Sequence, residues 1–213
     1  MKIIKFDNPH RQKHFKLFQT MEMPHFSMVA PVPVGRLKEY ISDRKLHFSG
    51  TIVYLLSKTA NEINEFRWRI RNNEVVEHTI VHPSFTVSTE ASDVFSYCYV
   101  DFHPDYQVFL QSVARAMKAM RAAPSLEDIP GRDDYLFMSS IPWVHFTGFM
   151  HAIHIPVHDS VPRIIWGKTR VTAGELLMPV GVQVHHGVVD GKHVGLFYER
   201  MEAYCREPES LIG

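Results

Sequence analysis

The sequence predicts an α/β protein of the α+β type, in which helices flank a mixed β-sheet. Segments with helical periodicity and segments with strand periodicity are interleaved along the chain, but without the strict alternation of a parallel βαβ protein. The chain has 213 residues, of which 45% are hydrophobic, and this is enough to bury one substantial core. We therefore expect residues 1–213 to form a single domain.

Capping and turn residues mark the elements in the first third of the chain. Asp7 or Asn8 can cap a helix that begins at Pro9, because proline lacks the N–H that would be unpaired in the first turn. The valine- and proline-rich segment that follows predicts an edge strand, since proline cannot complete a central hydrogen-bond ladder. The expected elements are a helix over Pro9–Thr20, a strand over Phe26–Val34, and helices over Arg36–Ser42 and Gly50–Phe66.

The middle of the chain carries a hairpin signal and a strongly periodic helix. Asn72 and Asn73 separate two short runs, and asparagine tolerates the positive φ of a tight hairpin turn. Val113 and Met117 belong to the apolar stripe of the helix. The expected elements are hairpin strands over Arg67–Arg71 and Glu74–Glu77, strands over Ser84–Thr89 and Phe95–Tyr99, and a helix over Tyr106–Ala123. We expect Arg67, Arg69 and Arg71 to form a solvated or salt-bridged face of the hairpin.

Several strands and a final helix complete the predicted fold. Val194, Phe197 and Met201 follow the spacing of one helical face. The expected elements are strands near Tyr135–Ser140, Phe146–Ile155, Arg163–Arg170 and Glu175–Val184, and a helix over His193–Arg206.

Composition excludes several classes of function. The 23 basic residues balance 23 acidic ones, so the chain lacks the basic surplus with which proteins capture nucleic acid or anionic membranes. Cys98 and Cys205 are too few for a disulfide scaffold. The first residues lack the apolar region of a secretory signal, and no apolar run has the length of a membrane-spanning helix. We expect a soluble, cytoplasmic protein without nucleic-acid or membrane partners.

One segment has the features of a catalytic site. A strand of alternating residues ends at His185 and His186, and a short connection leads through Asp190 and Gly191 into the last helix. An imidazole at a strand end can face a cleft, and imidazoles titrate near neutral pH, which suits a general base. The alternative is a structural loop pair between His186 and Asp190.

This segment resembles the signature of the chloramphenicol acetyltransferase family, and the similarity extends in order over essentially the whole chain. The family has a paired histidine followed by x-x-x-Asp-Gly, whereas the acyltransferase domains of 2-oxo acid dehydrogenases share only the shorter His-x-x-x-Asp-Gly. The resemblance implies a two-layer sandwich fold. The segments that carry it are His185–Gly195, His10–Phe15 with its Arg11, Pro142–Phe149, Glu65–Ile70, His82–Val87 and Leu177–Pro179.

The resemblance implies an acetyl-CoA-dependent O-acetyltransferase, a type of enzyme associated with antibiotic resistance. His186 matches the family's general base, which removes a proton from the acceptor hydroxyl. Asp190 and Arg11 match a pair that holds the loop. The family assembles as homotrimers with active sites between subunits, so His186 of one subunit would face its neighbour's pocket.

Further positions match the binding surfaces of the family. Phe18 and Phe26 keep the aromatic character of the acceptor pocket, and His186 would face one of them according to the packing. Lys168 matches a lysine beside the cofactor channel, where a cation can meet a CoA phosphate. Acetyl-CoA is the implied co-substrate.

The chain departs from the family pattern at the oxyanion region. Gly148 replaces a serine whose hydroxyl supports the tetrahedral oxyanion, and Ile165 replaces a threonine. Thr147, the Gly148 N–H or a water are the alternatives for this support. Glu22 lies where the family has an apolar or small residue, and this hints at an acceptor other than chloramphenicol. A second hypothesis is therefore a family member with weak or no chloramphenicol activity, which acylates another small acceptor or acts as a non-catalytic binding trimer.

The 14 histidines also raise the question of a metal site. His145 and His151 share one strand parity, as do His154 and His158. However, the chain contains no HExxH motif and no cysteine-containing ligand set. We expect no metal.

Overall fold

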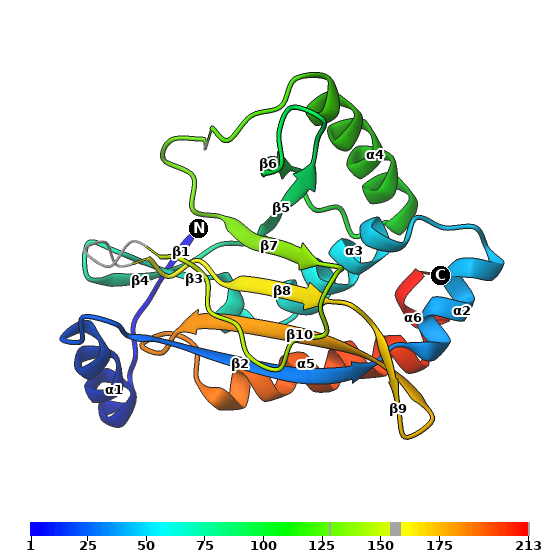
Figure 1. Cartoon of the computed structure of the whole chain (residues 1–213). Coiled ribbons are helices and arrows are strands. Elements are labelled where there is room, and N and C mark those ends of the chain that lie inside the picture. Colours follow the sequence, from blue (N-terminus) through cyan, green and yellow to red (C-terminus); the bar gives the residue numbers. More distant parts are fainter. Residues whose placement is uncertain (128, 154–158, 213) are drawn as a thin grey trace.

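The computed structural model describes residues 1–127, 129–153 and 159–212 of the chain (Figure 1). Its large sheet has seven strands in the order β2-β10-β8-β7-β5-β6, with β9 paired to β10, and a small sheet has the order β1-β4-β3. The strands are β1 (Lys2–Ile4), β2 (His25–Pro33), β3 (Trp68–Arg71), β4 (Glu74–Glu77), β5 (His82–Ser88), β6 (Phe95–Tyr99), β7 (Tyr135–Ile141), β8 (Arg163–Gly167), β9 (Arg170–Thr172) and β10 (Glu175–His185). The helices are α1 (Pro9–Gln19), α2 (Gly35–Asp43), α3 (Phe48–Asn61), the 3-10 turn η1 (Asn64–Arg67), α4 (Tyr106–Ala122), α5 (Gly191–Arg206) and α6 (Pro208–Ile212).

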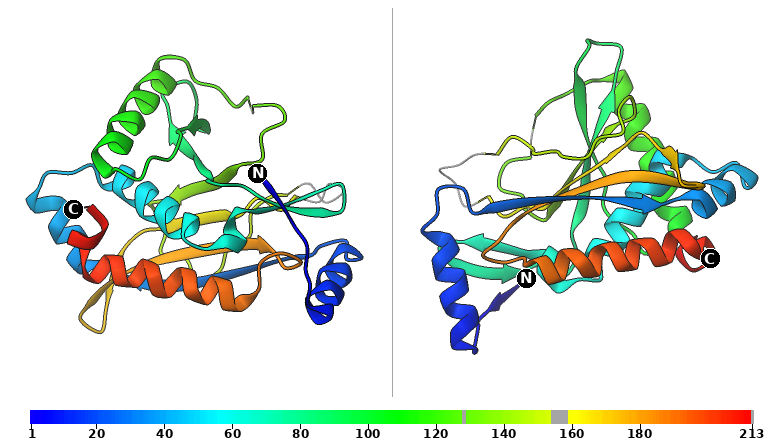
Figure 2. Two further views of the ribbon diagram at one scale, coloured as in Figure 1. Left: turned by 180° about the vertical axis from the view of Figure 1, so that it is seen from behind. Right: turned by 60° about the horizontal axis from the view of Figure 1, so that its bottom comes forward.

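The expected mixed sheet flanked by helices is confirmed. Strand β7 runs parallel to both β5 and β8, whereas β10 is antiparallel to β2 and β8. Helices α3 and α5 cover one face of the sheet, as two further views show (Figure 2). A segment around residues 142–153 crosses the other face (Figure 1).

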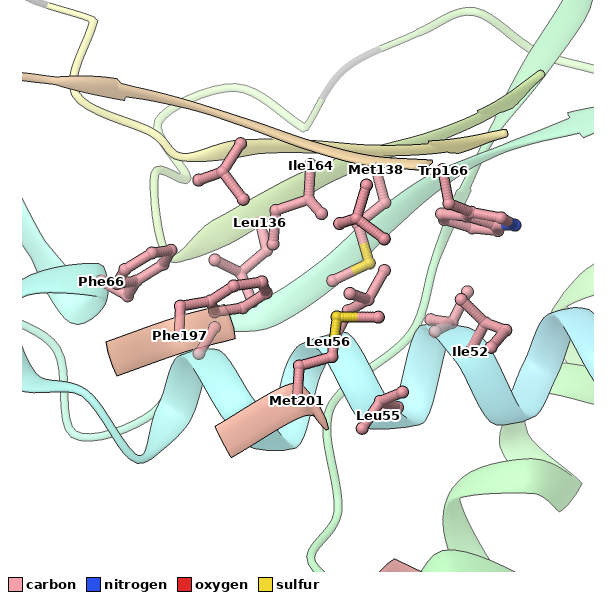
Figure 3. Close-up of a cluster of buried hydrophobic side chains, with 14 of the residues drawn as sticks. Ile52, Leu55, Leu56, Phe66, Leu136, Met138, Ile164, Trp166, Phe197 and Met201 are labelled. Carbon is pink, nitrogen blue, oxygen red and sulfur yellow. The ribbon is translucent and has the colours of Figure 1, made fainter. Parts of the chain in front are cut away.

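The core lies between the sheet and helices α3 and α5. In Figure 3, Leu56 of α3 and Met201 of α5 point toward Met138 and Ile164 of the sheet. All four side chains are almost completely excluded from solvent, and each such side chain contributes about 1.5–3 kcal/mol when it is buried. Because one continuous apolar cluster extends from Phe15 to the C-terminal helices, we retain a single domain over residues 1–213 as a proposal.

Local sequence signals position several elements as expected. Asn8 caps α1 by accepting the backbone N–H groups of His10 and Arg11. Asn72 and Asn73 have φ values of 50° and 63°, the left-handed conformation that a two-residue hairpin loop requires. Strand β2 lies at the edge of the sheet, where its prolines cost no central ladder.

The expected strand over Phe146–Ile155 is wrong for the residues that the structure describes. Residues 146–153 have no strand pairing, and His154 and Ile155 lie outside the described residues. The carbonyl of Phe149 accepts from the Ser27 hydroxyl, and the N–H of His151 donates to Oε1 of Gln183 (2.6 Å). The backbone of this segment therefore bonds to side chains of β2 and β10 and crosses the sheet instead of extending it.

The expected solvated arginine face of the hairpin is also wrong at Arg69. Its side chain is fully buried. The guanidinium donates to four backbone carbonyls, two of them at Phe66 and Tyr135 in fully buried bonds. Burial lowers the pKa of Arg69 to about 10, against the opposing charge of Asp133. Arg69 is therefore a structural side chain that joins the hairpin to the segment before β7.

Candidate active site

His186 lies just beyond the end of β10, in an aromatic setting built by α1 and β2. Its backbone N–H donates to the carbonyl of Pro24 (2.8 Å). The imidazole stacks on Phe18, with ring centroids 4.2 Å apart, and lies 4.7 Å from the ring of Phe26. The two phenylalanines expected in an acceptor pocket thus pack against His186 of their own chain. Their contacts fix the plane of the imidazole.

The preceding histidine has a different environment. His185 is fully buried, and its Nδ1 accepts the backbone N–H of Gly187 (3.0 Å). A Cβ at Gly187 would lie 2.9 Å from the His185 ring, so only glycine allows this close turn. His185 therefore shapes the connection, whereas the side chain of His186 is 29% exposed and within reach of a substrate.

Asp190 joins this connection to helix α5. Its Oδ1 accepts the N–H of Lys192 (3.2 Å), and His193 completes the capping box by accepting the Asp190 N–H. Its Oδ2 lies 3.8 Å from Nδ1 of His186. Burial acts to raise the pKa of Asp190, but the Lys192 N–H and the charge of His186 outweigh it, so the pKa lies below its usual range. Asp190 is therefore a carboxylate at neutral pH.

The expected direct pair between Asp190 and Arg11 is not formed, because His14 lies between them. Nη1 of Arg11 bonds Nδ1 of His14 (2.9 Å), and Nη2 donates to the carbonyl of Val188 (2.7 Å). Nε2 of His14 faces Oδ2 of Asp190 at 3.6 Å. Arg11 can still hold the loop, but through Val188 and His14.

His14 is the site residue that the motif analysis missed. It lies one helical turn after Arg11 on α1, and this i,i+3 spacing was the available signal. Because a guanidinium can only donate, Nδ1 of His14 must accept and the neutral ring keeps its proton on Nε2, facing Asp190. Arg11, His14, Asp190 and His186 thus form a row of polar groups that ends at the partly exposed imidazole, with a hydrogen bond between the first two and separations of 3.6 and 3.8 Å between the others.

This cluster is also where a metal would be sought. The ligand atoms of His14, His186 and Asp190 all lie within 4.8 Å of one another, and this is the sole such group in the described part of the chain. The Arg11 bond places a proton on the His14 nitrogen that would have to bind the metal, and the guanidinium charge repels a cation. The donor set fits a metal poorly, and the absence of a metal remains a prediction.

The other histidines of the metal alternative have separate bonds. His145 bonds the carbonyl of Lys168 and His151 bonds Gln183, while His154 and His158 lie outside the described residues.

Two adjoining cavities lie at the region where the 142–153 segment meets the sheet. The first cavity has a volume of about 590 Å³ and is lined by residues that include Phe137, His151 and Arg163. The second has a volume of about 690 Å³, with Arg121 and Trp143 in its lining. Thr86, Phe95, Ser139 and Phe149 line both cavities and form their shared wall. His186 lines neither cavity.

The comparison with protein families decides the affiliation, because the model of the family described as chloramphenicol acetyltransferase matches residues 1–202. The chain belongs to the chloramphenicol acetyltransferase family. A chloramphenicol acetyltransferase from Bacillus pumilus is 29% identical over 194 residues, which cover 91% of this chain and 88% of that protein. Chloramphenicol acetyltransferase 3 from Escherichia coli is 28% identical, with coverages of 96% and 98%.

Solved structures agree on the fold of this family member. A chloramphenicol acetyltransferase structure superposes with a TM-score of 0.83 at 24% identity, over 96% of this chain and 99% of the other. The dihydrolipoamide acetyltransferase of Azotobacter vinelandii has a TM-score of 0.68 at 14% identity, with coverages of 95% and 89%.

The residues at which this family member departs from the expected pattern lie beside the cavities. Thr147 and Gly148 are exposed and directly precede Phe149 of the shared wall. A Cβ added at Gly148 would meet no atom within 4 Å. Lys168 is exposed, and its N–H donates to the carbonyl of Val144, the neighbour of Trp143. The expected oxyanion and CoA residues therefore lie near the second cavity and the shared wall.

No helix among the described residues combines the length and the apolar character that crossing a membrane requires.

Proposed function

We propose that this protein is an acetyl-CoA-dependent O-acetyltransferase in which His186 is the general base. The observation that carries the proposal is the imidazole of His186, fixed between Phe18 and Phe26 and facing the Asp190 carboxylate. The family membership of the chain supports the same reaction class. Because acetyl-CoA is the donor, the proposal places the protein in the cytoplasm.

In this mechanism His186 removes the proton of the acceptor hydroxyl while that oxygen attacks the thioester carbonyl carbon. The tetrahedral intermediate then collapses, the C–S bond breaks, and the imidazolium returns the proton to the CoA sulfur. The products are an acetyl ester and free CoA, and no covalent enzyme intermediate forms. Asp190 stabilises the transient imidazolium, while Arg11 and His14 hold Asp190 and the Val188 carbonyl in position.

The two cavities suggest how the substrates are arranged. The second cavity suits CoA because Arg121 lines it and Lys168 lies beside it, and cations there can bind the phosphates. Arg121 has no acidic partner among the described residues. The acceptor then occupies the first cavity, with the reacting atoms at the shared wall. Thr147 or the Gly148 N–H supports the oxyanion there.

The position of His186 outside both cavities favours a homotrimer with active sites between subunits. If His186 of one subunit faces the shared wall of the next, each site combines a base and a pair of cavities from different chains. Such head-to-tail contacts close into a ring when the rotation allows it.

Mixing two inactive variants tests this arrangement. His186→Ala removes the base, and the double variant Arg121→Glu with Lys168→Glu removes CoA affinity at exposed positions. When the two are refolded together, random assembly gives a competent base–cavity pair at about one quarter of the sites, so activity is expected to return to that fraction of wild type. Mixing without refolding is the control. If co-refolded samples stay as inactive as the separate variants, the site lies within one chain and the shared-site arrangement fails.

Gly148→Ser tests the assignment of the oxyanion region. The open space around Gly148 accepts the added side chain, and its hydroxyl supplies a donor in addition to Thr147 and the Gly148 N–H. We expect kcat with chloramphenicol to rise, by up to about 10²-fold, because one oxyanion donor is worth that much. Gly148→Ala is the matched control, with the Cβ but no hydroxyl, and should give no increase. An unchanged or lower kcat for the serine variant would contradict the assignment.

The alternative function is a binding trimer, or an acyltransferase for an acceptor other than chloramphenicol, and it is favoured by Gly148 and Ile165. Free-thiol release from acetyl-CoA, measured with chloramphenicol and a panel of small alcohols and amines, separates these functions. Turnover with any acceptor supports the transferase. The absence of turnover with every acceptor, together with the absence of CoA binding in calorimetry, rejects it in favour of the binding trimer.

A further inference from the structure

The first cavity combines aromatic side chains with a polar floor, which consists of His151, Asp159 and Arg163. Its volume of about 590 Å³ is in the range that holds a drug-sized ligand. Two side chains of its lining, His151 and Ser84, carry buried polar atoms that have no hydrogen-bond partner among the described residues. Such atoms cost free energy unless a ligand or an ordered water bonds them. Its aromatic residues are Phe95, Tyr97, Tyr99, Phe137 and Phe149.

The bonds around His151 determine which of its nitrogens can accept a hydrogen bond. Oε1 of Gln183 accepts the backbone N–H of His151 at 2.6 Å, so this oxygen, and not the amide nitrogen, faces His151. Nδ1 of the imidazole lies 3.3 Å from the same oxygen. Because Oε1 carries no hydrogen, Nδ1 must be the donor, and the lone pair of the neutral ring is on Nε2.

Nε2 of His151 is buried and uncharged, and it has no hydrogen-bond partner among the residues that the structure describes. Burial lowers the pKa of His151 to about 4, the Gln183 bond opposes this shift, and the charge of Arg163 adds to it. At neutral pH the ring is therefore uncharged, and its Nε2 can accept a hydrogen bond from a ligand.

The remaining polar groups of the floor add no net charge. The guanidinium of Arg163 is largely buried, bonds Oδ2 of Asp159 at 2.5 Å and lies over the ring of Phe137. Its charge is thus neutralised within the cavity lining. Ser84 is 2% exposed and lies three strands away from Gln183, so its hydroxyl is not part of this floor. The floor consequently favours an uncharged ligand with a hydrogen-bond donor.

We propose that the first cavity selects an acceptor with an aromatic ring that carries an uncharged hydrogen-bond donor, such as a phenolic hydroxyl, directed at Nε2 of His151. Ser84 lies three strands away from Gln183 in the register of the sheet, so its hydroxyl belongs to another part of the lining. The aromatic residues stack on the ring, and the hydroxyl to be acetylated lies at the other end, toward the shared wall. The assignment of this ligand as the acceptor rests on the proposed function.

Equilibrium binding tests the site without requiring turnover. The probes are 4-methylphenol and 4-methylanisole, which differ in whether the oxygen attached to the ring can donate a hydrogen bond. Each is titrated into the wild-type protein, and binding is followed by ligand-observed NMR. We expect the phenol to bind about tenfold more tightly, because it satisfies an otherwise unpaired buried acceptor. His151→Leu should remove the preference, whereas His145→Leu, a histidine outside both cavities, should preserve it. Equal binding of the two probes by wild type, or an unchanged preference in His151→Leu, overturns the proposal.

Turnover separates this proposal from the proposed function. The substrates are 2-(4-hydroxyphenyl)ethanol and 2-(4-methoxyphenyl)ethanol, assayed with acetyl-CoA. A lower KM for the phenol than for its methyl ether supports both the site and the transferase, provided that His151→Leu abolishes the difference and leaves the KM for acetyl-CoA unchanged. A phenol preference in binding, without acetylation of these alcohols or of any acceptor in the panel and without CoA binding, supports the site and rejects the transferase. Acetylation of both alcohols with the same KM supports the transferase and overturns the selectivity of the floor.

Discussion

His186→Ala is expected to lower kcat by about 10²–10⁴-fold, which is the usual contribution of a positioned general base. In the proposed mechanism the imidazole accepts the proton of the attacking hydroxyl and returns it to the leaving sulfur, and no neighbouring side chain among the described residues is placed to replace it in both steps. His14 keeps its proton on the nitrogen that faces Asp190, and Asp190 is ionised and caps α5. Free-thiol release measured at saturating acetyl-CoA gives kcat.

The control for this variant is His10→Ala, an exposed histidine on the same helix as His14. It should keep wild-type kcat, and both variants should keep the Tm and the KM for acetyl-CoA. A fall in kcat of less than about tenfold in His186→Ala, which is well below the usual range, would remove His186 as the base even though the fold is intact.

The largest effect on stability is expected at Arg69. Arg69→Met keeps most of the side-chain length but leaves four carbonyls without their donor, two of them in fully buried bonds. Each fully buried carbonyl left unpaired costs about 1–3 kcal/mol, so the free energy of unfolding should fall by about 2–6 kcal/mol. Urea denaturation followed by circular dichroism measures this loss.

Arg71→Met is the matched control on the same strand. Its guanidinium bonds both carboxylate oxygens of Asp133 at a partly exposed position and, among the described residues, no backbone carbonyl, so the loss should be smaller than at Arg69. A loss at Arg69 no larger than the loss at Arg71 would show that water replaces the guanidinium at the buried carbonyls.

The sequence predicted the elements that local chemistry determines. Asn8 caps its helix through its own side chain, and Asn72 and Asn73 adopt the left-handed turn that their residue type favours. The motif around His186 and Asp190 was recognisable because it lies within one connection, where the end of a strand and the start of a helix fix its geometry.

The features that were missed depend on partners distant in the chain. Residues 146–153 were expected to form a strand, but their backbone bonds to side chains at Ser27 and Gln183. Strand parity places Arg69 on a face without saying whether that face is covered. The Arg11–Asp190 pair was predicted from a motif, whereas the structure places His14 between the two side chains.

Strand β10 serves two purposes along its length. Gln183 fixes the orientation of His151 at the cavity floor, and three residues later, just beyond the strand, lies His186, the proposed general base. In the proposed trimer His151 and His186 of one chain belong to different active sites. Each β10 therefore connects one active site of the ring to the next. A shift of β10 would change the fit of the substrate in one site and, at the same time, the position of the proposed base in the neighbouring site. In this arrangement a substitution at His151 would alter acceptor fit in one site without moving β10, and would leave the base of the neighbouring site in place.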